Sequence, residues 1–169
     1  AAVAQVSVDV DEAAIAQHLS EAVRFRTVSH QSIEEFEAQE FTGFIGWVER
    51  TYPEVNQSLE RVLLGDYTML YRWPGSNATL QPILLTAHYD VVPVLPGTED
   101  RWTHQPYAGD IADGIVWGRG TLDDKSAVIA QLEAATLLLK AGFQPARTVY
   151  FSFGHDEEVG GTRGAANER

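Results

Sequence analysis

The spacing of apolar residues predicts that the folded part of the chain opens with a helix. Between residues 11 and 26, apolar side chains recur every three to four positions, which is the period of an amphipathic helix. Asp9 and Glu12 are spaced like a capping box, so the helix is expected to begin there. Residues 1–10 carry no firm pattern. We expect them to form a loose N-terminal arm ahead of one folded unit, residues 11–169.

A second apolar stripe predicts a longer helix over residues 33–51. Ser32 and Glu35 form another capping box, and Pro53 stands where this helix is expected to end. The stripe is rich in phenylalanine, and we assign these rings to the core rather than to a ligand.

Short apolar runs, typical of strands, follow these helices. Residues 59–64 and 67–73 indicate a hairpin around Gly65 and Asp66. Residues 83–87 are almost wholly apolar, as expected of a central strand covered on both faces. Residues 147–153 form a similar run.

A strand over residues 114–117 leads into a helix over residues 126–140, which Gly142 closes. The alternation of strands and helices predicts an α/β fold. A long loop, residues 91–110, separates these elements from the strand before them. Loops of this length are often functional, so Trp102 and His104 are candidates for substrate contact, although an ordinary loop role is the commoner one.

The composition narrows the classes of function. With 24 acidic and 12 basic side chains, the net charge is -12, so we expect no nucleic acid and no anionic membrane as a partner. No apolar run approaches the ~20 residues of a membrane span. The chain holds no cysteine, so a metal would be bound by histidine and carboxylates. The compartment stays open.

Acidic and histidine side chains gather directly after three of the predicted strands. These clusters are His88-Tyr89-Asp90, Asp123-Asp124 and His155-Asp156-Glu157-Glu158. Parallel strands end at one edge of a sheet, where ligands bind in open α/β folds. Neighbouring carboxylates are costly to ionise together unless a cation lies between them. We therefore expect the three clusters to converge on a divalent cation.

In that arrangement, one carboxylate of the last cluster binds the metal. Its neighbour is then placed to act as general base toward a water that the metal activates. Asp90 could hold the second nitrogen of His88 or fix the backbone beside it.

Each cluster also has a plainer interpretation when taken alone. A histidine with a nearby aspartate at a strand end is more often structural. Asp123 and Asp124 suit a helix N-terminus, where the dipole favours negative charge, and Lys125 could neutralise one of them. The acidic run 156–158 suits a solvated turn. A nicotinamide site is excluded because Asp123 stands where the dinucleotide fingerprint requires glycine.

Together and in this order, the stretches 88–93, 118–125 and 154–158 resemble the di-zinc metallopeptidase family of aminoacylase, carnosinase and carboxypeptidase G. They are most similar to its Gly-X carboxypeptidase and N-acyl-amino-acid hydrolase branch. The similarity runs from about Asp11 to Gly161. It implies a three-layer α/β/α domain with a mixed, mostly parallel sheet.

The resemblance also implies a role for each residue of the site. His88 would bind one metal, Asp123 would bridge two metals, and Glu158 would bind the other. Glu157 would be the general base, and Asp90 would orient His88. The cofactors would be two divalent ions, with zinc favoured over cobalt and manganese. A cis peptide is implied directly after Asp123.

The chain departs from the family in its length. Members are much longer and carry, after this point, a further acidic ligand, a lid domain and a last histidine ligand. We therefore expect residues 11–169 to be the N-terminal portion of a catalytic domain truncated before the lid, inactive alone and weaker in metal affinity. The longer protein would hydrolyse an amide bond of a dipeptide, a short peptide or an N-acyl amino acid, and would form a homodimer through the lid.

Two other classes of function remain open. One is a non-catalytic metal-binding or interaction module on the same scaffold, against which an intact Glu157 argues. The other is an acidic calcium-binding module with oxygen ligands, in which His88 would have no role.

Overall fold

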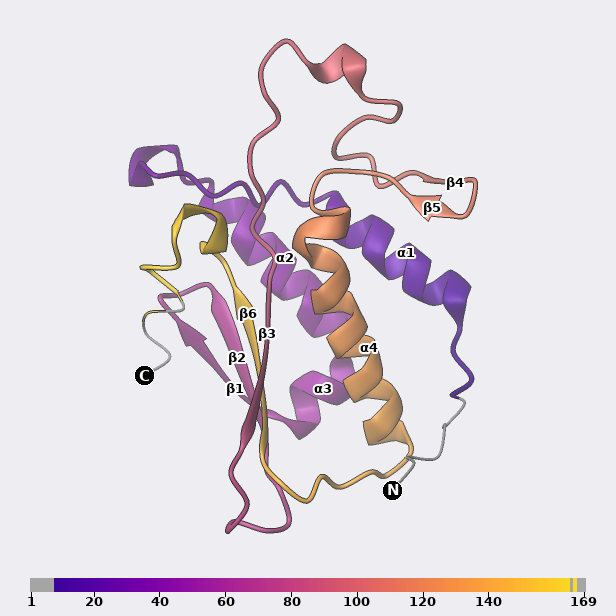
Figure 1. Ribbon diagram of the computed structural model, residues 1–169, viewed down its shortest axis with the longest axis vertical. Coiled ribbons are helices and arrows are strands. Elements are labelled where there is room, and N and C mark those ends of the chain that lie inside the picture. The colour runs from indigo at the N-terminus through magenta and orange to yellow at the C-terminus, as the bar shows by residue number, and fades with distance from the viewer. Residues whose placement is uncertain (1–7, 165, 167–169) are drawn as a thin grey trace, which may run out of the picture.

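The computed structural model describes residues 8–164 and 166, and a four-stranded mixed sheet lies at its centre (Figure 1). The strands follow the order β1-β2-β6-β3. β1 pairs with β2 and β2 with β6 in the antiparallel sense, whereas β6 and β3 are parallel. The bounds are Glu60–Leu64 for β1, Thr68–Trp73 for β2, Ile83–His88 for β3 and Val149–Gly154 for β6.

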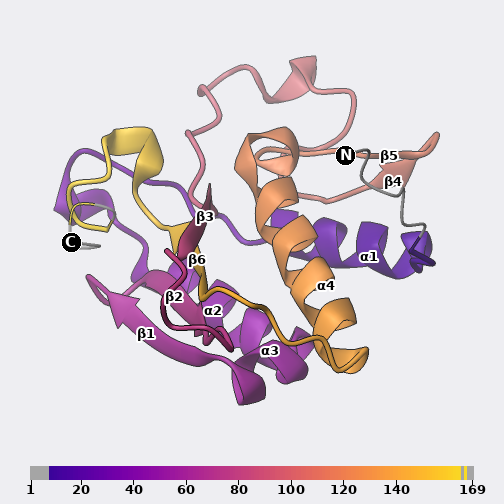
Figure 2. The same ribbon diagram turned by 60° about the horizontal axis from the view of Figure 1, so that its bottom comes forward.

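Four helices pack against one face of this sheet (Figures 1 and 2). They are α1 (Glu12–Val23), α2 (Ala38–Thr51), α3 (Pro53–Ser58) and α4 (Ser126–Lys140). Their apolar stripes meet alternate residues of β2 and β6, including Met69, Tyr71 and Phe153, in one core. No helix in the part of the chain that the structure describes is long and apolar enough to cross a membrane.

The expected α/β class with a mixed sheet is confirmed, and three details differ. Among the described strands, two of the three pairings are antiparallel, so the sheet is not mostly parallel. Helices cover one face, and on the other face Val62 and Leu84 are 53% and 51% exposed. β3 is an edge strand rather than a central one. The apolar run of β3 therefore belongs to a strand that is not buried on both faces.

The predicted helix starts were partly wrong. Asp11, not Asp9, caps α1, because its carboxylate accepts the backbone N–H of Ala14 at 3.0 Å. Residues 1–7 of the expected arm lie outside the described residues, and residues 8–10 are exposed without helix or strand.

The helix expected over residues 33–51 is divided in two. Ser32 caps a short 3₁₀ turn, Ile33–Glu35, and α2 begins only at Ala38. Phe36 breaks the helix because it adopts an extended backbone and packs its ring on Phe41, with 4.4 Å between ring centroids. Pro53 ends α2 as expected but also opens α3, where a proline fits the first turn.

The strand expected over residues 114–117 does not join the main sheet. β5 (Ile115–Val116) pairs with β4 (Ile111–Ala112) in a separate hairpin beside α1 (Figure 1). Asp113 and Gly114 form its turn, both with positive φ. An Asp-Gly pair between short apolar runs is a strong hairpin signal, and the sequence interpretation missed it.

Candidate metal centre

Two of the three clusters meet because β3 and β6 are parallel neighbours. His88 is the last residue of β3 and lies opposite Gly154, the last residue of β6. The backbone N–H of Tyr89 donates to the carbonyl of Gly154 at 2.9 Å, which carries the pairing one residue further. After Gly154 the chain enters a 3₁₀ turn, Glu157–Val159. The segments that follow β3 and β6 therefore lie at the same edge of the sheet.

Asp123 reaches the same place by another route, from a kinked turn (Thr121–Lys125) that precedes α4, in which Asp123 and Asp124 have non-helical backbone angles. Gly120 before it has a φ of +81°, and a Cβ there would lie 2.4 Å from Cγ1 of Val91. Only glycine fits so close to the loop that leaves β3. The peptide between Asp123 and Asp124 is cis, as the resemblance implies.

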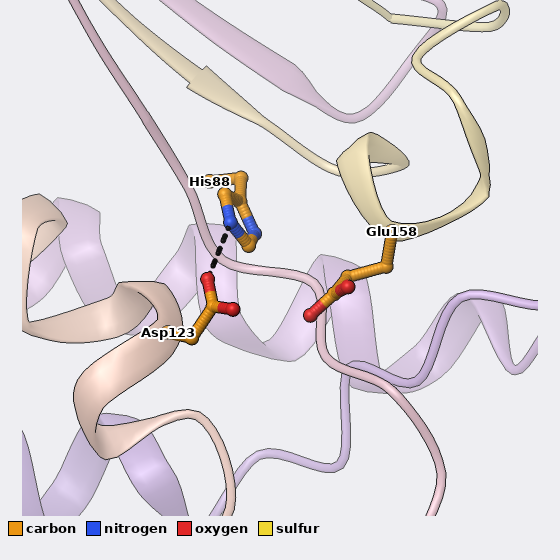
Figure 3. A group of neighbouring side chains, drawn as sticks. All are labelled: His88, Asp123 and Glu158. Atoms are coloured by element: carbon orange, nitrogen blue, oxygen red, sulfur yellow. Dashed lines mark hydrogen bonds and ion pairs between the residues drawn. The ribbon is translucent and has the colours of Figure 1, made fainter.

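His88, Asp123 and Glu158 together form a cluster that could hold a metal ion (Figure 3). Each offers one ligand atom, and these atoms all lie within 4.8 Å of one another. Nε2 of His88 is 3.0 Å from Oδ1 of Asp123. A tetrahedral zinc ion with bonds of about 2.0–2.2 Å would separate its ligand atoms by roughly 3.4 Å. The side chain of Asp123 is 75% exposed, and its distance to His88 is close to this separation, so the cluster fits divalent metal.

Asp90 ties the first cluster to the third. Its carboxylate is fully buried and accepts the backbone N–H groups of Glu157 at 3.1 Å and Glu158 at 3.0 Å. The same carboxylate lies 3.3 Å from Nδ1 of His88, whose ring is thereby turned with Nε2 toward Asp123. A carboxylate behind a metal-binding histidine fixes the ring's orientation and raises its basicity.

Glu157 stands at the side of the cluster. Its carboxylate is 3.7 Å from Nε2 of His88, and its side chain is 64% exposed. With His88 and Asp124 it lines a pocket of ≈ 490 Å³. It belongs to the same 3₁₀ turn as Glu158, so the two neighbouring carboxylates approach the cluster from one short segment.

The electrostatics of the cluster favour a cation. Burial lowers the pKa of His88, but the hydrogen bond and charge of Asp90 and the charge of Glu157 outweigh it and raise that pKa to about 9. The pKa of Glu158 is raised by burial and by the charge of Asp123. The pKa of Asp124 is also raised, chiefly by burial. A divalent ion would relieve the repulsion among these carboxylates.

Lys125 does not neutralise either aspartate, contrary to the sequence interpretation. Its side chain is fully buried, and Nζ donates to the carbonyls of Ala22 at 2.9 Å and Phe25 at 2.7 Å. Burial lowers its pKa to about 7. These bonds attach the kinked turn of Asp123 to the end of α1, a positioning role that no sequence signal indicated.

The remaining members of the third cluster are structural. Nδ1 of His155 is 2.7 Å from the hydroxyl of Thr68, inside the core. The buried carboxylate of Asp156 accepts the backbone N–H groups of Arg163 at 2.6 Å and Gly164 at 3.1 Å. Both side chains therefore hold the segment after β6 in place.

The chain is similar to known proteins in both sequence and fold. A model of the family described as Peptidase family M20/M25/M40 matches residues 84–168, half of the chain. The Dictyostelium discoideum protein named "Probable carboxypeptidase S-like 2" is 45% identical over 155 residues, 90% of this chain and 30% of that protein. The Xenopus tropicalis N-fatty-acyl-amino acid synthase/hydrolase PM20D1 is 39% identical over 153 residues, 89% of this chain and 29% of that protein.

A solved structure, that of human carnosine dipeptidase 1, shares the fold with a TM-score of 0.69 at 23% identity. The match covers 88% of this chain and 33% of the dipeptidase. The chain thus spans about 30% of the length of these curated relatives. From the family match, which includes His88, Asp123 and Glu158, the chain belongs to peptidase family M20/M25/M40.

Proposed function

We propose that the whole protein carrying this chain hydrolyses an amide bond in a peptide or an N-acyl amino acid with the help of divalent metal. The observation that carries this proposal is the convergence of His88, Asp123 and Glu158, with the carboxylate of Glu157 beside them. Family membership and relatives named as carboxypeptidases and N-acyl-amino acid hydrolases support it.

His88, Asp123 and Glu158 would hold the metal. We propose two ions, with Asp123 between them, His88 on one and Glu158 on the other. The mixed imidazole and carboxylate donors favour zinc over cobalt or manganese. When bound, such ions polarise a carbonyl and lower the pKa of water toward about 7.

The chain's own residues then move the proton. Glu157 takes a proton from the attacking water as the oxygen of that water bonds to the carbonyl carbon. It returns that proton to the nitrogen as the carbon–nitrogen bond breaks, so a carboxylic acid and an amine leave the site. Asp90 is a positioning residue, because it holds the ring of His88 and the backbone of Glu157 and Glu158 together.

Glu157→Gln separates this function from a metal-binding module that does no chemistry. In the whole protein we expect the variant to bind zinc as the wild type does, but to hydrolyse a Gly-X dipeptide or an N-acyl amino acid about 10²–10⁴-fold more slowly. Glu99→Gln, at an exposed position of the loop, is the control and should leave both properties unchanged. Chelator-sensitive hydrolysis that is as fast in Glu157→Gln as in the wild type would show that Glu157 is not the general base. No chelator-sensitive hydrolysis in the wild type would favour the module.

A further inference from the structure

A second pocket, of ≈ 640 Å³, is lined by residues of α1, the start of α4, β5 and the loop before β4. Its walls are mostly apolar and aromatic. They include Leu19, Trp102, Ile115, Trp117 and Leu122. The volume falls within the range of about 300–1,000 Å³ found for small-molecule sites. None of these side chains takes part in the chemistry described above.

This pocket adjoins the metal cluster through two shared wall residues. Gly118 and Leu122 line it, and they also line a smaller pocket of ≈ 300 Å³ that contains Asp123 and Glu158. Leu122 directly precedes Asp123 and is 88% exposed. A large apolar side chain exposed between a reactive site and an apolar pocket is placed to contact the apolar part of a ligand.

The position of Glu157 indicates which half of the substrate faces this pocket. Glu157 delivers the proton to the leaving nitrogen, so the amine half must lie on its side of the cluster. That side is the pocket of ≈ 490 Å³ lined by His88, Asp124 and Glu157. An acyl half that points away from Glu157 would pass Asp123 and Leu122, and Leu122 also lines the apolar pocket.

The walls of the apolar pocket are held by contacts of their own. The guanidinium of Arg119 lies 5.2 Å from the ring centroid of Trp102. The ring of Trp117 stacks on His104 with 4.8 Å between centroids, and Nδ1 of His104 is 2.9 Å from a carboxylate oxygen of Asp110. Trp102 and His104, which the sequence marked as candidates for substrate contact, both line the pocket.

We propose that this pocket, here called the acyl pocket, binds the apolar acyl chain of an N-acyl amino acid substrate. The inference rests on the proposed function and narrows it, because it assigns a chain-length preference to residues outside the metal cluster. Burial of each further methylene should strengthen binding until the pocket is filled.

Ile115→Glu tests the acyl pocket, with Ile111→Glu as its matched control. The two isoleucines belong to the same small hairpin and are 50% and 49% exposed, but only Ile115 lines the pocket. Calorimetry with octanamide, a neutral acyl probe, on the 169-residue chain measures binding without turnover. In the whole protein, kcat/KM for N-octanoyl-glycine relative to N-acetyl-glycine measures the preference during hydrolysis. Leu122→Ala is a second wall variant at a position exposed enough to tolerate it.

We expect octanamide to bind the wild type and Ile111→Glu equally, and Ile115→Glu at least tenfold more weakly. The octanoyl-to-acetyl ratio of kcat/KM should fall at least tenfold in Ile115→Glu and severalfold in Leu122→Ala, and should not change in Ile111→Glu. The acyl pocket is refuted if octanamide does not bind, or if Ile115→Glu behaves like Ile111→Glu. Octanamide binding that depends on Ile115, without chelator-sensitive hydrolysis, would support the pocket while overturning the proposed function.

Discussion

The carboxylate of Asp90 accepts the backbone N–H of Glu158 at 3.0 Å, although the two residues belong to segments that follow different strands. A second bond joins Asp90 to the N–H of Glu157 at 3.1 Å. One buried carboxylate therefore fixes the distance between the histidine at the end of β3 and the acidic turn after β6. Asp90 acts through the position of its neighbours.

Asp90→Asn is expected to weaken both the fold and the metal site. An amide offers one oxygen where the carboxylate offers two, and its NH₂ group would face a backbone N–H. We expect the free energy of unfolding to fall by about 2–4 kcal/mol and the zinc affinity to fall about 10–100-fold. Urea unfolding and calorimetry measure the two effects. Asp100→Asn, at an exposed loop position, is the control. A variant as stable as Asp100→Asn would show that the two N–H groups do not need this carboxylate.

Gly120→Ala is expected to destabilise the turn that carries Asp123. Gly97 provides a close comparison, because its φ of +79° matches the +81° of Gly120 while nothing lies within 4 Å of its Cβ position. Gly97→Ala should cost about 1 kcal/mol, from backbone strain alone. Gly120→Ala adds the contact with Val91 at 2.4 Å and should cost about 1–3 kcal/mol more. Thermal unfolding compares them, and equal costs would contradict the close packing of this turn.

Tyr71→Phe is expected to change how stability depends on alkaline pH. Burial raises the pKa of Tyr71 to about 12, so between about pH 10 and 12 the folded chain keeps a proton that the unfolded chain has lost. Stability from this group is therefore complete below pH 10 and is lost as pH rises. Tyr71→Phe has no hydroxyl to ionise, so it does not lose this stability at alkaline pH. It also lacks the hydrogen bond that the tyrosine hydroxyl donates to Asn56.

In urea unfolding, Tyr71→Phe should be about 1 kcal/mol less stable than the wild type at pH 8. The difference should vanish near pH 11, because each pH unit between the unfolded pKa of about 10 and the folded pKa of about 12 removes about 1.4 kcal/mol of stability from the wild type. A difference that stays constant from pH 8 to pH 11 would mean that Tyr71 titrates alike in both states.

The elements that the sequence predicted well are those whose local pattern and tertiary environment agree. The helix expected over residues 126–140 has those bounds, and Gly142 follows it with positive φ. The strand over residues 83–87 and the hairpin around Gly65 are also confirmed. The clusters of His88 and Glu158 converge as expected, because β3 and β6 are neighbours and pair in the parallel sense.

The failures arise where contacts distant in sequence override a local signal. The helix over residues 33–51 is broken by Phe36, whose ring finds Phe41 and Tyr67, and nothing in its sequence neighbourhood marks this. Lys125 points away from the aspartates beside it toward carbonyls about 100 positions earlier in the chain. Asp123 was expected at the end of a strand of the main sheet and instead lies in the kinked turn Thr121–Lys125 before α4.

The proposed hydrolysis depends on His88, Asp123 and Glu158 binding the same divalent metal centre. Calorimetric titration of the chain with zinc tests it directly, in the wild type and in His88→Ala, Asp123→Asn and Glu158→Gln, with Glu99→Gln as control. We predict that each of the three variants weakens zinc binding at least tenfold, Asp123→Asn most of all, while Glu99→Gln binds as the wild type does. Zinc binding of equal strength in all of these proteins, or in none of them, would contradict the account.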